Sequence, residues 1–528
     1  MDLEVLKGTM IVNRTIKNKV NWEYIFVCLL GIAFLFVYAI STSPLTSNFW
    51  GSDSAFFQMV GKNLNRGLIM YKDIFDIKGP YLFLIEYLGY AIGIGRYGVF
   101  IMEVVNLCIA LYFLHKSVNL VAEKYRVQCL MASLILFFFF LSCTLDCGNL
   151  SEEYALPYLL FCLFLYLRYR IAGKMGMAAF CYGISFAIVA FGRVTNSTFI
   201  CILILDIMIT MILEKKWKDL LKSAGLFLGG IIVVVVPFFI YFTEKGALSD
   251  MIKAVYTFSF SYATESTFLD SVSAIRWPIM IVFVMIEGMA LKVWWRDMQK
   301  RILLIINLIV MVITLNLGNA YIHYYQLLIP SILTAFWLWW MYQENENGIK
   351  KKTILWLSIA IVLNLVYFVP YSGRVVAAVG LNTKKIAQTT LGKYAEKIEQ
   401  LDSYGRGTYG YKAQAQVDDV LEKIPEGKRK NVYNYETKAQ WLLLSDLEPY
   451  DKYCITADHF SCLSDDIAND IENMFDNHKP EYIVTDYNVK IQNKFVRNCI
   501  KNDYVRVYKN DAYILYQQKS KNHRIDKI

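Results

Sequence analysis

The feature that most restricts the fold of this chain is a series of apolar runs separated by short polar loops. Each run approaches the length of about 20 residues that a helix needs to cross a membrane. Hydrophobic residues make up 56% of the 528 residues and charged residues only 19%, whereas soluble domains have roughly 45–50% and 25% of these two classes. The sequence therefore predicts an all-α polytopic membrane protein.

Eleven segments are predicted to span the membrane. They are 23–40, 97–114, 127–143, 154–170, 176–192, 197–213, 224–242, 276–292, 302–317, 326–342 and 353–369. The segment 81–94 is shorter and contains Glu86, so we interpret it as an interfacial or re-entrant helix rather than a span.

The basic loops predict the orientation in the membrane. If 81–94 does not cross, the basic stretches all fall on the same side as the basic N-terminus, namely 115–126, 168–174, 214–222, 292–301 and 344–352. Cytoplasmic loops carry an excess of lysine and arginine, so we expect a cytoplasmic N-terminus and an extracytoplasmic C-terminus. The same distribution explains the formal charge of +9 without a nucleic-acid partner.

The composition changes after Pro370, which predicts two domains, a transmembrane domain over 1–370 and an extracytoplasmic α/β domain over 371–528. Strands are expected at 431–436, 453–458, 481–486, 504–510 and 512–518, and helices at 384–402, 413–423, 464–475 and 490–500. The last two strands should form a hairpin at Asn510-Asp511. Most of the 11 cysteines lie in apolar runs, and a Cys454–Cys462 bridge is one option in the polar part.

The predicted first outer loop, 41–96, carries an unusual set of ionisable residues next to the membrane, Asp53, Asp73, Asp76 and Lys78. Such residues are candidates for function because they are costly to place there. A structural interpretation is equally open for each. Asp53 is at a position where it could simply cap a helix, and the run from Asp73 to Lys78 could be a solvated loop.

Further polar residues fall on the same predicted side. Glu152 and Glu153 begin an apolar helix, where acidic residues are favourable in any case. Arg193 could be an interfacial anchor, and His323 could belong to an aromatic belt. Each residue alone is weak support for a site, whereas their gathering on one membrane face favours a functional role.

Four motifs occur in a recognisable order, namely GSDSAFF with Asp53, KDIFDIKGPYLFLIEYLG with Lys78, GNLSEEYALP with Glu152 and Glu153, and YIHYYQLLIP with His323. This order resembles the GT-C class of polyprenyl-phosphate-sugar-dependent glycosyltransferases. The family 39-like members of this class include protein O-mannosyltransferases and lipid A aminoarabinose transferases. Two departures stand out. Gly79 replaces the first of two prolines that often follow the lysine, and the second acidic position is often aspartate.

The resemblance implies an integral-membrane glycosyltransferase that moves a hexosyl or pentosyl group from a polyprenyl-phosphate donor to an acceptor hydroxyl. The reaction would invert the anomeric configuration on the outer face of the cell membrane, in modification of cell-surface glycans or lipids. Partners would be the donor, a glycan, lipid or protein acceptor, and the bilayer, but no nucleic acid.

The resemblance also implies roles for individual residues. Asp53 would be the general base, aided by Glu152 or Glu153, with Asp146 as a third option for the second acidic site. Lys78, Arg193 and His323 would bind the donor phosphate. Residues expected to position the substrates are Asp73, Asp76, Asn149, Asn196, Tyr324 and Gln326. No metal site is assigned and no cofactor is required, while dependence on a divalent ion stays open.

Two other classes are consistent with a hydrophobic chain that has an outer site. A polysaccharide polymerase or ligase of another fold would rely on large late loops. A transporter of lipid-linked sugars would place its polar residues in mid-span and often show paired halves.

Overall fold

The computed structural model describes residues 22–46, 49, 51–173, 175–259, 276–316, 321–345 and 413–519. The basic N-terminal segment, the predicted span 353–369 and the predicted helix 384–402 lie outside these residues.

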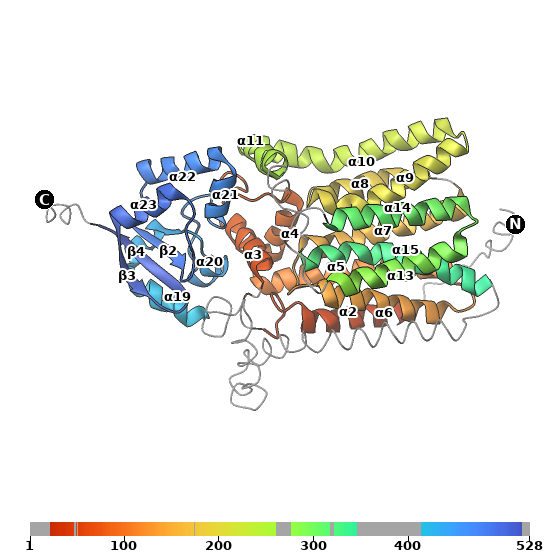
Figure 1. The fold of residues 1–528 in the computed structure, drawn as a ribbon, viewed down its shortest axis with the longest axis horizontal. Helices are drawn as coiled ribbons and strands as arrows, with labels where there is room; N and C mark the ends of the chain where they lie inside the picture. Colours follow the sequence, from red (N-terminus) through yellow and green to blue (C-terminus); the bar gives the residue numbers. More distant parts are fainter. Residues whose placement is uncertain are drawn as a thin grey trace, which may run out of the picture.

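Most of the described chain before residue 346 forms a bundle of long helices that lie side by side (Figure 1). These helices are α2 (Trp22–Tyr38), α5 (Arg96–Val121), α6 (Arg126–Thr144), α7 (Ser151–Ala172), α8 (Ala178–Ala190), α9 (Thr198–Leu213), α10 (Trp217–Glu244), α13 (Arg276–Trp294), α14 (Met298–Asn316) and α15 (Leu328–Asn345). Short segments join them, namely η1 (Val194–Ser197), α11 (Leu248–Ile252), η2 (Lys253–Phe258) and η3 (Ile322–Leu327).

All the predicted spans that fall on described residues coincide with helices of this bundle. Five helices are long and apolar enough to cross a membrane, namely Arg96–Val121, Arg126–Thr144, Val194–Leu213, Trp217–Glu244 and Met298–Leu315. Trp22–Tyr38 and Ala178–Ala190 are apolar but shorter. The protein is therefore a membrane protein.

Two short helices, α3 (Ser52–Asn65) and α4 (Pro80–Ala91), lie between the bundle and the C-terminal part (Figure 1). Pro80 is at the start of α4, where its fixed φ is compatible with a helix and its missing N–H leaves no bond unmade. With 12 residues, among them the buried Glu86, α4 is shorter than the roughly 20 residues that a straight helix needs to cross a membrane.

The C-terminal part contains a four-stranded sheet in the order β1-β2-β4-β3, with β1 and β2 parallel and the other pairs antiparallel. Its strands are β1 (Val432–Asn434), β2 (Tyr482–Asp486), β3 (Tyr504–Lys509) and β4 (Tyr513–Gln518). The helical segments around it are α19 (Ala413–Leu421), η4 (Glu426–Asn431), α20 (Gln440–Ser445), α21 (Ala457–Leu463), α22 (Asp465–Asn477) and α23 (Lys494–Asp503). The hairpin expected at Asn510-Asp511 joins β3 to β4.

The strand predicted at 453–458 is wrong. The carbonyl oxygens of Tyr453 and Cys454 accept hydrogen bonds from the side chains of Tyr433 and Asn434, so they are not part of a backbone ladder. Thr456 then adopts a left-handed conformation with φ 58°, and α21 begins at the next residue. The alternation of apolar residues reflects packing against β1 rather than strand pairing.

The C-terminal part is docked on the short helices at the end of the bundle. One cluster of buried apolar residues includes Phe57 of α3, Phe83 of α4, and Trp441 and Tyr513 of the C-terminal part. The backbone N–H of Phe75 also donates to the carbonyl of Lys452 at 2.9 Å. None of the cysteines forms a disulfide, so the Cys454–Cys462 bridge does not form.

Candidate active site

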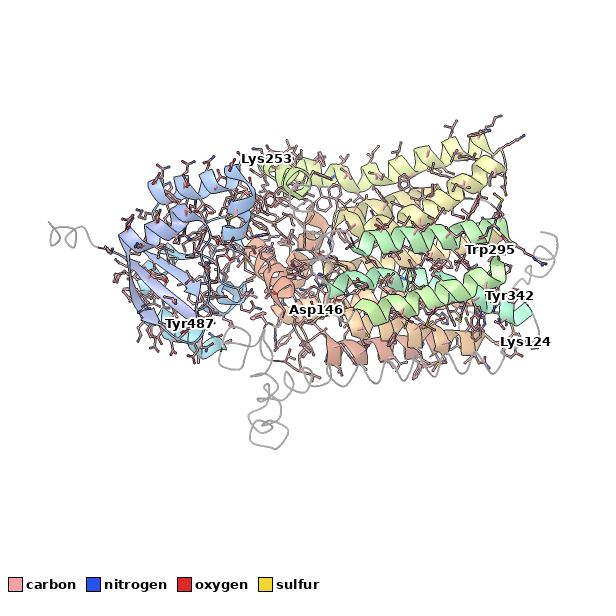
Figure 2. The ribbon with its side chains drawn as sticks, in the orientation of Figure 1. Lys124, Asp146, Lys253, Trp295, Tyr342 and Tyr487 are labelled. Atoms are coloured by element: carbon pink, nitrogen blue, oxygen red, sulfur yellow. The ribbon has the colours of Figure 1, made fainter. Side chains whose placement is uncertain are left out.

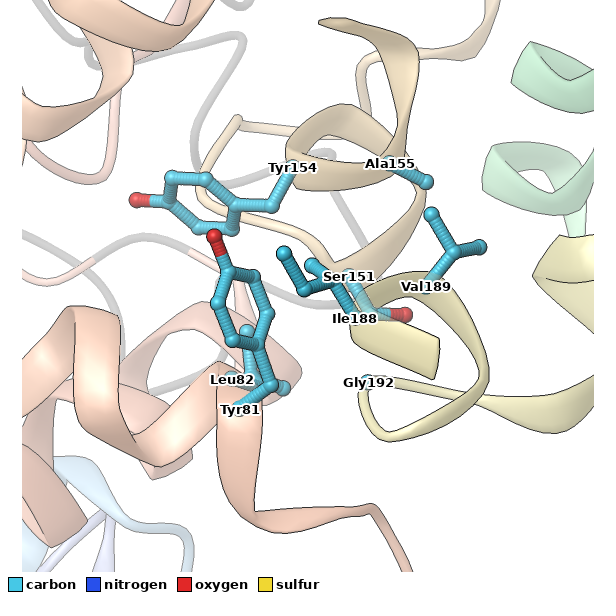
Figure 3. Close-up of a pocket in the computed structure, with 8 residues that line it drawn as sticks. All are labelled: Tyr81, Leu82, Ser151, Tyr154, Ala155, Ile188, Val189 and Gly192. Carbon is cyan, nitrogen blue, oxygen red and sulfur yellow. The ribbon is translucent and has the colours of Figure 1, made fainter. Parts of the chain in front are cut away.

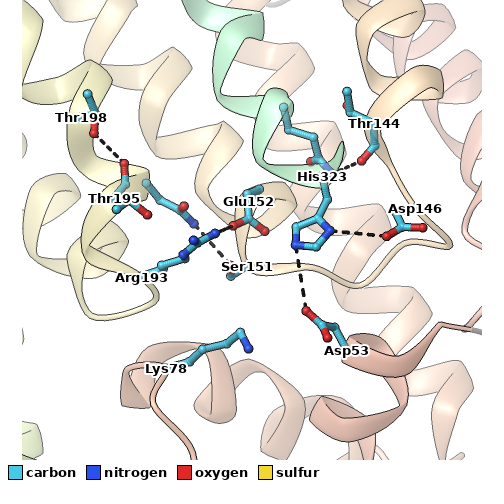
Figure 4. Close-up of polar contacts among 12 residues, drawn as sticks. Asp53, Lys78, Thr144, Asp146, Ser151, Glu152, Arg193, Thr195, Thr198 and His323 are labelled. Atoms are coloured by element: carbon cyan, nitrogen blue, oxygen red, sulfur yellow. Dashed lines mark hydrogen bonds and ion pairs between the residues drawn. The ribbon is translucent and has the colours of Figure 1, made fainter. Parts of the chain in front are cut away.

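Charged side chains gather at the end of the bundle that faces the C-terminal part. Figure 2 shows Asp146 at this end, whereas Lys124, Trp295 and Tyr342 lie at the opposite end. We define the charged cluster as Asp53, Lys78, Asp146, Glu152, Arg193 and His323, which come from five different stretches of the chain (Figure 4).

His323 connects two carboxylates of the charged cluster. Its Nδ1 lies 3.4 Å from Oδ2 of Asp146, and its Nε2 lies 4.0 Å from Oδ2 of Asp53. Asp53 is the second residue of α3, whose N-cap position is occupied by Gly51 without any side-chain cap. Asp53 therefore does not act as the N-cap, and its carboxylate is available to the cluster.

Arg193 forms the second ion pair of the charged cluster. Its Nη1 donates to Oε1 of Glu152 at 2.8 Å, and its guanidinium lies 3.5 Å from the ring centre of Tyr324. Glu152 is buried and in the first turn of α7, where the helix N-terminus favours an anion. The pair and the ring together fix the orientation of the guanidinium, so Arg193 is more than an interfacial anchor.

The peptide group between Lys78 and Gly79 is held by two hydrogen bonds. Its carbonyl accepts a hydrogen bond from the hydroxyl of Tyr71 at 2.8 Å, and the N–H of Gly79 donates to the carbonyl of Gly192 at 3.0 Å. A Cβ added to Gly79 would lie 1.9 Å from the carbonyl oxygen of Phe191. Proline has neither the N–H nor the space for this contact, so glycine suits position 79 and proline does not.

This close approach places the loop of Lys78 directly against the loop that leads to Arg193. Figure 4 shows the side chains of Lys78 and His323 approaching Asp53 from different sides, whereas Arg193 is directed toward Glu152. The charges of all three side chains act on the carboxyl group of Asp53.

The pKa values follow from this arrangement. Partial desolvation by the surrounding protein would raise the pKa of Asp53, but the charges of Lys78, His323 and Arg193 outweigh it and lower the pKa below its usual value. Burial would lower the pKa of His323, but the hydrogen bond to Asp146 and the charges of Glu152 and Asp53 raise it above its usual value. Burial likewise opposes the charge of Lys78, yet Asp76 and Asp53 raise its pKa. At neutral pH, Asp53 is ionised and Lys78 is charged.

The charged cluster is open to solvent on one side. The side chains of Asp53 and Asp146 are 46% and 41% exposed, whereas those of Glu152 and His323 are buried. A separate cavity beside it is lined by residues that include Tyr81, Ser151 and Tyr154 (Figure 3). It offers only about 10 Å³ to the centre of a water molecule, which is room for about one water. A larger molecule can approach the cluster from the exposed side of the two aspartates.

The structure places Glu153 away from the charged cluster, although it is next to Glu152 in the sequence. Its Oε2 accepts the N–H of Asn149 at 3.0 Å, and Glu103 accepts the same N–H at 2.7 Å. Glu86 interacts electrostatically with Glu103. We define Glu86, Glu103 and Glu153 as the buried carboxyl cluster, and none of them forms an ion pair within the described part of the chain.

The remaining predicted residues make mostly local contacts. Asp73 accepts the N–H of Ile69 within its own turn. Asp76 is buried and lies 4.0 Å from Lys78. Asn196 donates to Ser151 at 3.4 Å and Gln326 donates to the carbonyl of Thr144 at 3.0 Å. The backbone N–H of Asn149 donates to the buried carboxyl cluster. Asp76 and Tyr324 are the residues predicted to position substrates for which the described part of the chain shows a direct contact with the charged cluster.

The sequence analysis missed two residues of the C-terminal part that reach this site. Gln440 donates to the carbonyls of Phe49 and Gly51 at 2.9 and 3.2 Å, immediately before α3. The charge of Lys438 also lowers the pKa of Asp53. These residues are nearly 400 positions away from Asp53, and no local pattern marks them.

A family model described as the competence-induced protein Ccs4 N-terminal domain matches residues 15–333. The chain belongs to this family. The matched Ccs4 domain covers more than half of the chain and includes every residue of the charged cluster, whereas the C-terminal sheet lies beyond it. No curated protein matches the sequence.

Solved structures with a similar fold come from the GT-C class. Cupriavidus metallidurans ArnT bound to undecaprenyl phosphate has a TM-score of 0.55 at 8% identity, covering 95% of this chain and 99% of ArnT. The apo state of ArnT has a TM-score of 0.57 at 10% identity, covering 94% and 98%. This member of the Ccs4 family therefore has the GT-C fold, which confirms the predicted resemblance at the level of the fold.

Among the described residues, no group of three or more His, Cys, Asp or Glu side chains is arranged to hold a metal ion.

Proposed function

We propose that the protein is an integral-membrane glycosyltransferase that transfers a sugar from a polyprenyl-phosphate donor to an acceptor hydroxyl. The observation that carries this proposal is the solvent-exposed carboxylate of Asp53, on which the charges of Lys78, Arg193 and His323 act. An ionised carboxylate can accept a proton, and the neighbouring cations can bind an anionic leaving group. The GT-C fold shared with ArnT, whose structure contains undecaprenyl phosphate, supports a lipid-linked donor.

In the proposed reaction the acceptor oxygen attacks the anomeric carbon of the sugar. Asp53 takes the proton of the acceptor hydroxyl, a new C–O bond forms, and the bond to the polyprenyl phosphate breaks on the opposite face, so that the configuration inverts. The phosphate leaves as an anion, and the cationic groups of Lys78, Arg193 and His323 stabilise the charge it develops. Glu152 orients Arg193 through their ion pair, and Tyr324 holds its guanidinium from the other side.

The proposed topology has eleven spans, a cytoplasmic N-terminus, and both the charged cluster and the C-terminal domain outside. Two observations support it. Asp146 of the charged cluster lies at the end of the bundle that faces the C-terminal sheet (Figure 2), and α4 has only 12 residues, among them the buried Glu86. The donor's polyprenyl tail would lie among the helices, and its phosphate would reach Lys78 at the interface. The sugar would be delivered to a cell-envelope glycan or lipid.

The two alternatives are less well supported. A polymerase or ligase of another fold does not agree with the GT-C fold of this chain. A transporter would need a polar path in mid-bundle, whereas the charged cluster lies at one end of the helices and is open to solvent there.

The test uses purified protein in lipid nanodiscs with a panel of radiolabelled polyprenyl-phosphate sugars. Wild type should hydrolyse or transfer one sugar slowly, and Asp53→Asn should lose this activity by roughly 100-fold or more while it still binds the donor. A matched control is Asp73→Asn, because Asp73 lies in the same loop but accepts a hydrogen bond within its own turn. Unchanged turnover in Asp53→Asn would refute Asp53 as the base, and no binding of any donor would refute the proposed function.

A further inference from the structure

A hollow on the surface of the C-terminal part is lined by cationic side chains. It has a volume of about 480 Å³ and lies between the loop at residues 489–491, helix α23 and strands β3 and β4. Its cationic residues are Lys490, Arg497, Lys501 and Arg506, and we call it the basic hollow. No acidic residue lines it.

The positive charge of the basic hollow contrasts with the rest of the C-terminal part. Residues 413–519 contain 14 lysines and arginines but 18 aspartates and glutamates, so this part is acidic as a whole. Within it, residues 489–509 contain six basic residues and one acidic residue. The positive charge of the basic hollow is therefore a local property of residues 489–509 and not a consequence of a basic C-terminal part.

The cations of the basic hollow are not neutralised by the protein. None of the four forms an ion pair within the described part of the chain, and Asp503, the acidic residue of this stretch, pairs with Lys479 at 2.6 Å. The guanidinium of Arg497 donates to the backbone carbonyl of Ile491 at 3.4 Å. A hollow lined by one sign of charge concentrates counter-ions of the other sign, so an anion bound here would relieve the mutual repulsion of the four cations.

We propose that the basic hollow binds an anionic glycan, a sugar polymer that carries phosphate or carboxylate groups. A polymer is favoured over a single small anion because the four cations come from three separate segments around a wide hollow. The choice of a glycan among anionic polymers rests on the proposed glycosyl transfer, since a polymer held here would keep its hydroxyl groups near the same enzyme.

Two other anionic partners agree less well with the structure. Strand β3 and helix α23 lie on the side of the C-terminal part away from the helix bundle (Figure 1), so the basic hollow does not face the bilayer around the bundle. Single-stranded nucleic acid needs exposed aromatic faces on which bases stack. Two aromatic residues line the basic hollow. Tyr504 is buried, and its hydroxyl donates to the carbonyl of Pro480 at 2.7 Å, whereas Tyr516 is partly buried and packs against an apolar cluster.

The experiment measures binding of labelled polymers to the full-length protein in nanodiscs of phosphatidylcholine at low salt. The probes are a poly(glycerol phosphate) oligomer, an oligogalacturonate, neutral dextran and oligo(dT) with the same number of charges. The test variant is Arg497→Glu with Arg506→Glu. The matched control is Lys423→Glu with Lys430→Glu, which changes the charge of the same domain equally at exposed positions outside the basic hollow.

We expect at least one of the two anionic glycans to bind wild type and the control alike, and the test variant at least about ten-fold more weakly, with a shallower dependence on salt. Equal losses in both variants, tighter binding of oligo(dT) than of either glycan, or no glycan binding would each overturn the proposal. If the test variant does not fold, Lys490→Gln with Lys501→Gln replaces it, because both lysines are exposed. Donor hydrolysis at Asp53 should be unchanged in these variants, so failure of the two proposals can be told apart.

Discussion

Glu152 and Glu153 are adjacent in the sequence, yet their carboxylates lie in two regions with opposite electrostatics. Glu152 belongs to the charged cluster, where it pairs with Arg193 at 2.8 Å. Glu153 belongs to the buried carboxyl cluster, where it shares the N–H of Asn149 with Glu103 and has no cationic partner among the described residues. Successive residues of a helix point about 100° apart, so Glu152 and Glu153 face different parts of the structure. Glu152 lies beside the proposed reaction, whereas Glu153 lies among the buried residues next to it.

The loop between α6 and α7 contacts both the charged cluster and the buried carboxyl cluster. Asp146 and Asn149 have φ values of 45° and 60°, a left-handed conformation that is strained for residues other than glycine. Asp146 contacts His323 on one side of the loop, and the backbone of Asn149 is held by two carboxyl groups on the other. The buried carboxyl cluster thus holds the backbone of this loop in place, whereas the charged cluster contains a side chain of the loop, that of Asp146. Mutations in the two regions should therefore differ in kind, in activity for one and in stability for the other.

The largest effect is expected for Lys78→Met, which removes a cation from the charged cluster. Loss of one group that stabilises a developing negative charge typically lowers the rate by about 100- to 1,000-fold, and the same loss is expected for donor hydrolysis. The control is Lys72→Met, because Lys72 lies in the same loop but is exposed and donates only to the carbonyl of Lys245. Equal activity of the two variants would show that Lys78 does not contact the donor phosphate.

The next largest effect distinguishes the two adjacent glutamates. Glu152→Gln leaves Arg193 without its ion pair and should lower kcat by roughly 10- to 100-fold, because the guanidinium is no longer held in place. Glu153→Gln keeps the shape of the side chain in a region without cations, so its turnover should stay within about three-fold of wild type. The measurement is single-turnover hydrolysis of the donor. A larger loss in Glu153→Gln than in Glu152→Gln would reverse the assignment of the second acidic site.

The helices of the bundle could be predicted from the sequence because the length of an apolar run directly limits how a chain can cross a membrane. The residues of the charged cluster could be named only from their order along the chain and from a resemblance. Which of Asp146, Glu152 and Glu153 faces Asp53 depends on the phase of α7 and on a strained loop, and neither is visible in the composition of GNLSEEYALP.

The contacts of the C-terminal part could not be predicted for a different reason. Gln440 holds the backbone at Phe49 and Gly51, and this contact joins segments that are nearly 400 residues apart. The strand expected at 453–458 failed because side chains of β1 occupy the carbonyl groups that a neighbouring strand would need. In both cases tertiary contacts decide the local structure.

A smaller effect, on the pH profile, is expected at His323. Its pKa is raised above the usual value of about 6.5 by the hydrogen bond to Asp146 and by the charges of Glu152 and Asp53, against the opposing effect of burial. His323 therefore keeps its positive charge to higher pH than a free imidazole and loses this charge as the pH rises through its pKa. Donor hydrolysis should fall by about ten-fold on the alkaline side, and this decline should be absent in His323→Gln.

The source of this pH dependence can be tested at Asp146. Asp146→Asn removes the carboxylate that is hydrogen-bonded to His323, so the alkaline decline should move to lower pH. His459→Gln is the control, because His459 is exposed in the C-terminal part, and its profile should match wild type. If the alkaline decline persists unchanged in His323→Gln, the titration of another group causes it.

The smallest effect on activity is expected for Glu86→Gln in the buried carboxyl cluster. Burial raises the pKa of Glu86 to about 8, so this side chain is largely protonated at neutral pH and glutamine closely matches its neutral form. Turnover should therefore stay within about two-fold of wild type, since the neutral amide preserves both shape and charge. The pH dependence of folding stability that Glu86 causes should have the opposite sign from that of a carboxylate in an ion pair.

Folding must bring Glu86 from an unfolded pKa of about 4.3 to a higher value, so the folded state binds more protons between these two pKa values. Stability consequently falls as the pH rises through this window and stays low above the folded pKa. Glu86→Gln removes this dependence, so its Tm should exceed that of wild type by more at pH 8 than at pH 5. A Tm difference that does not depend on pH would mean that Glu86 is ionised in the folded protein, and that the buried carboxyl cluster has a cationic partner after all.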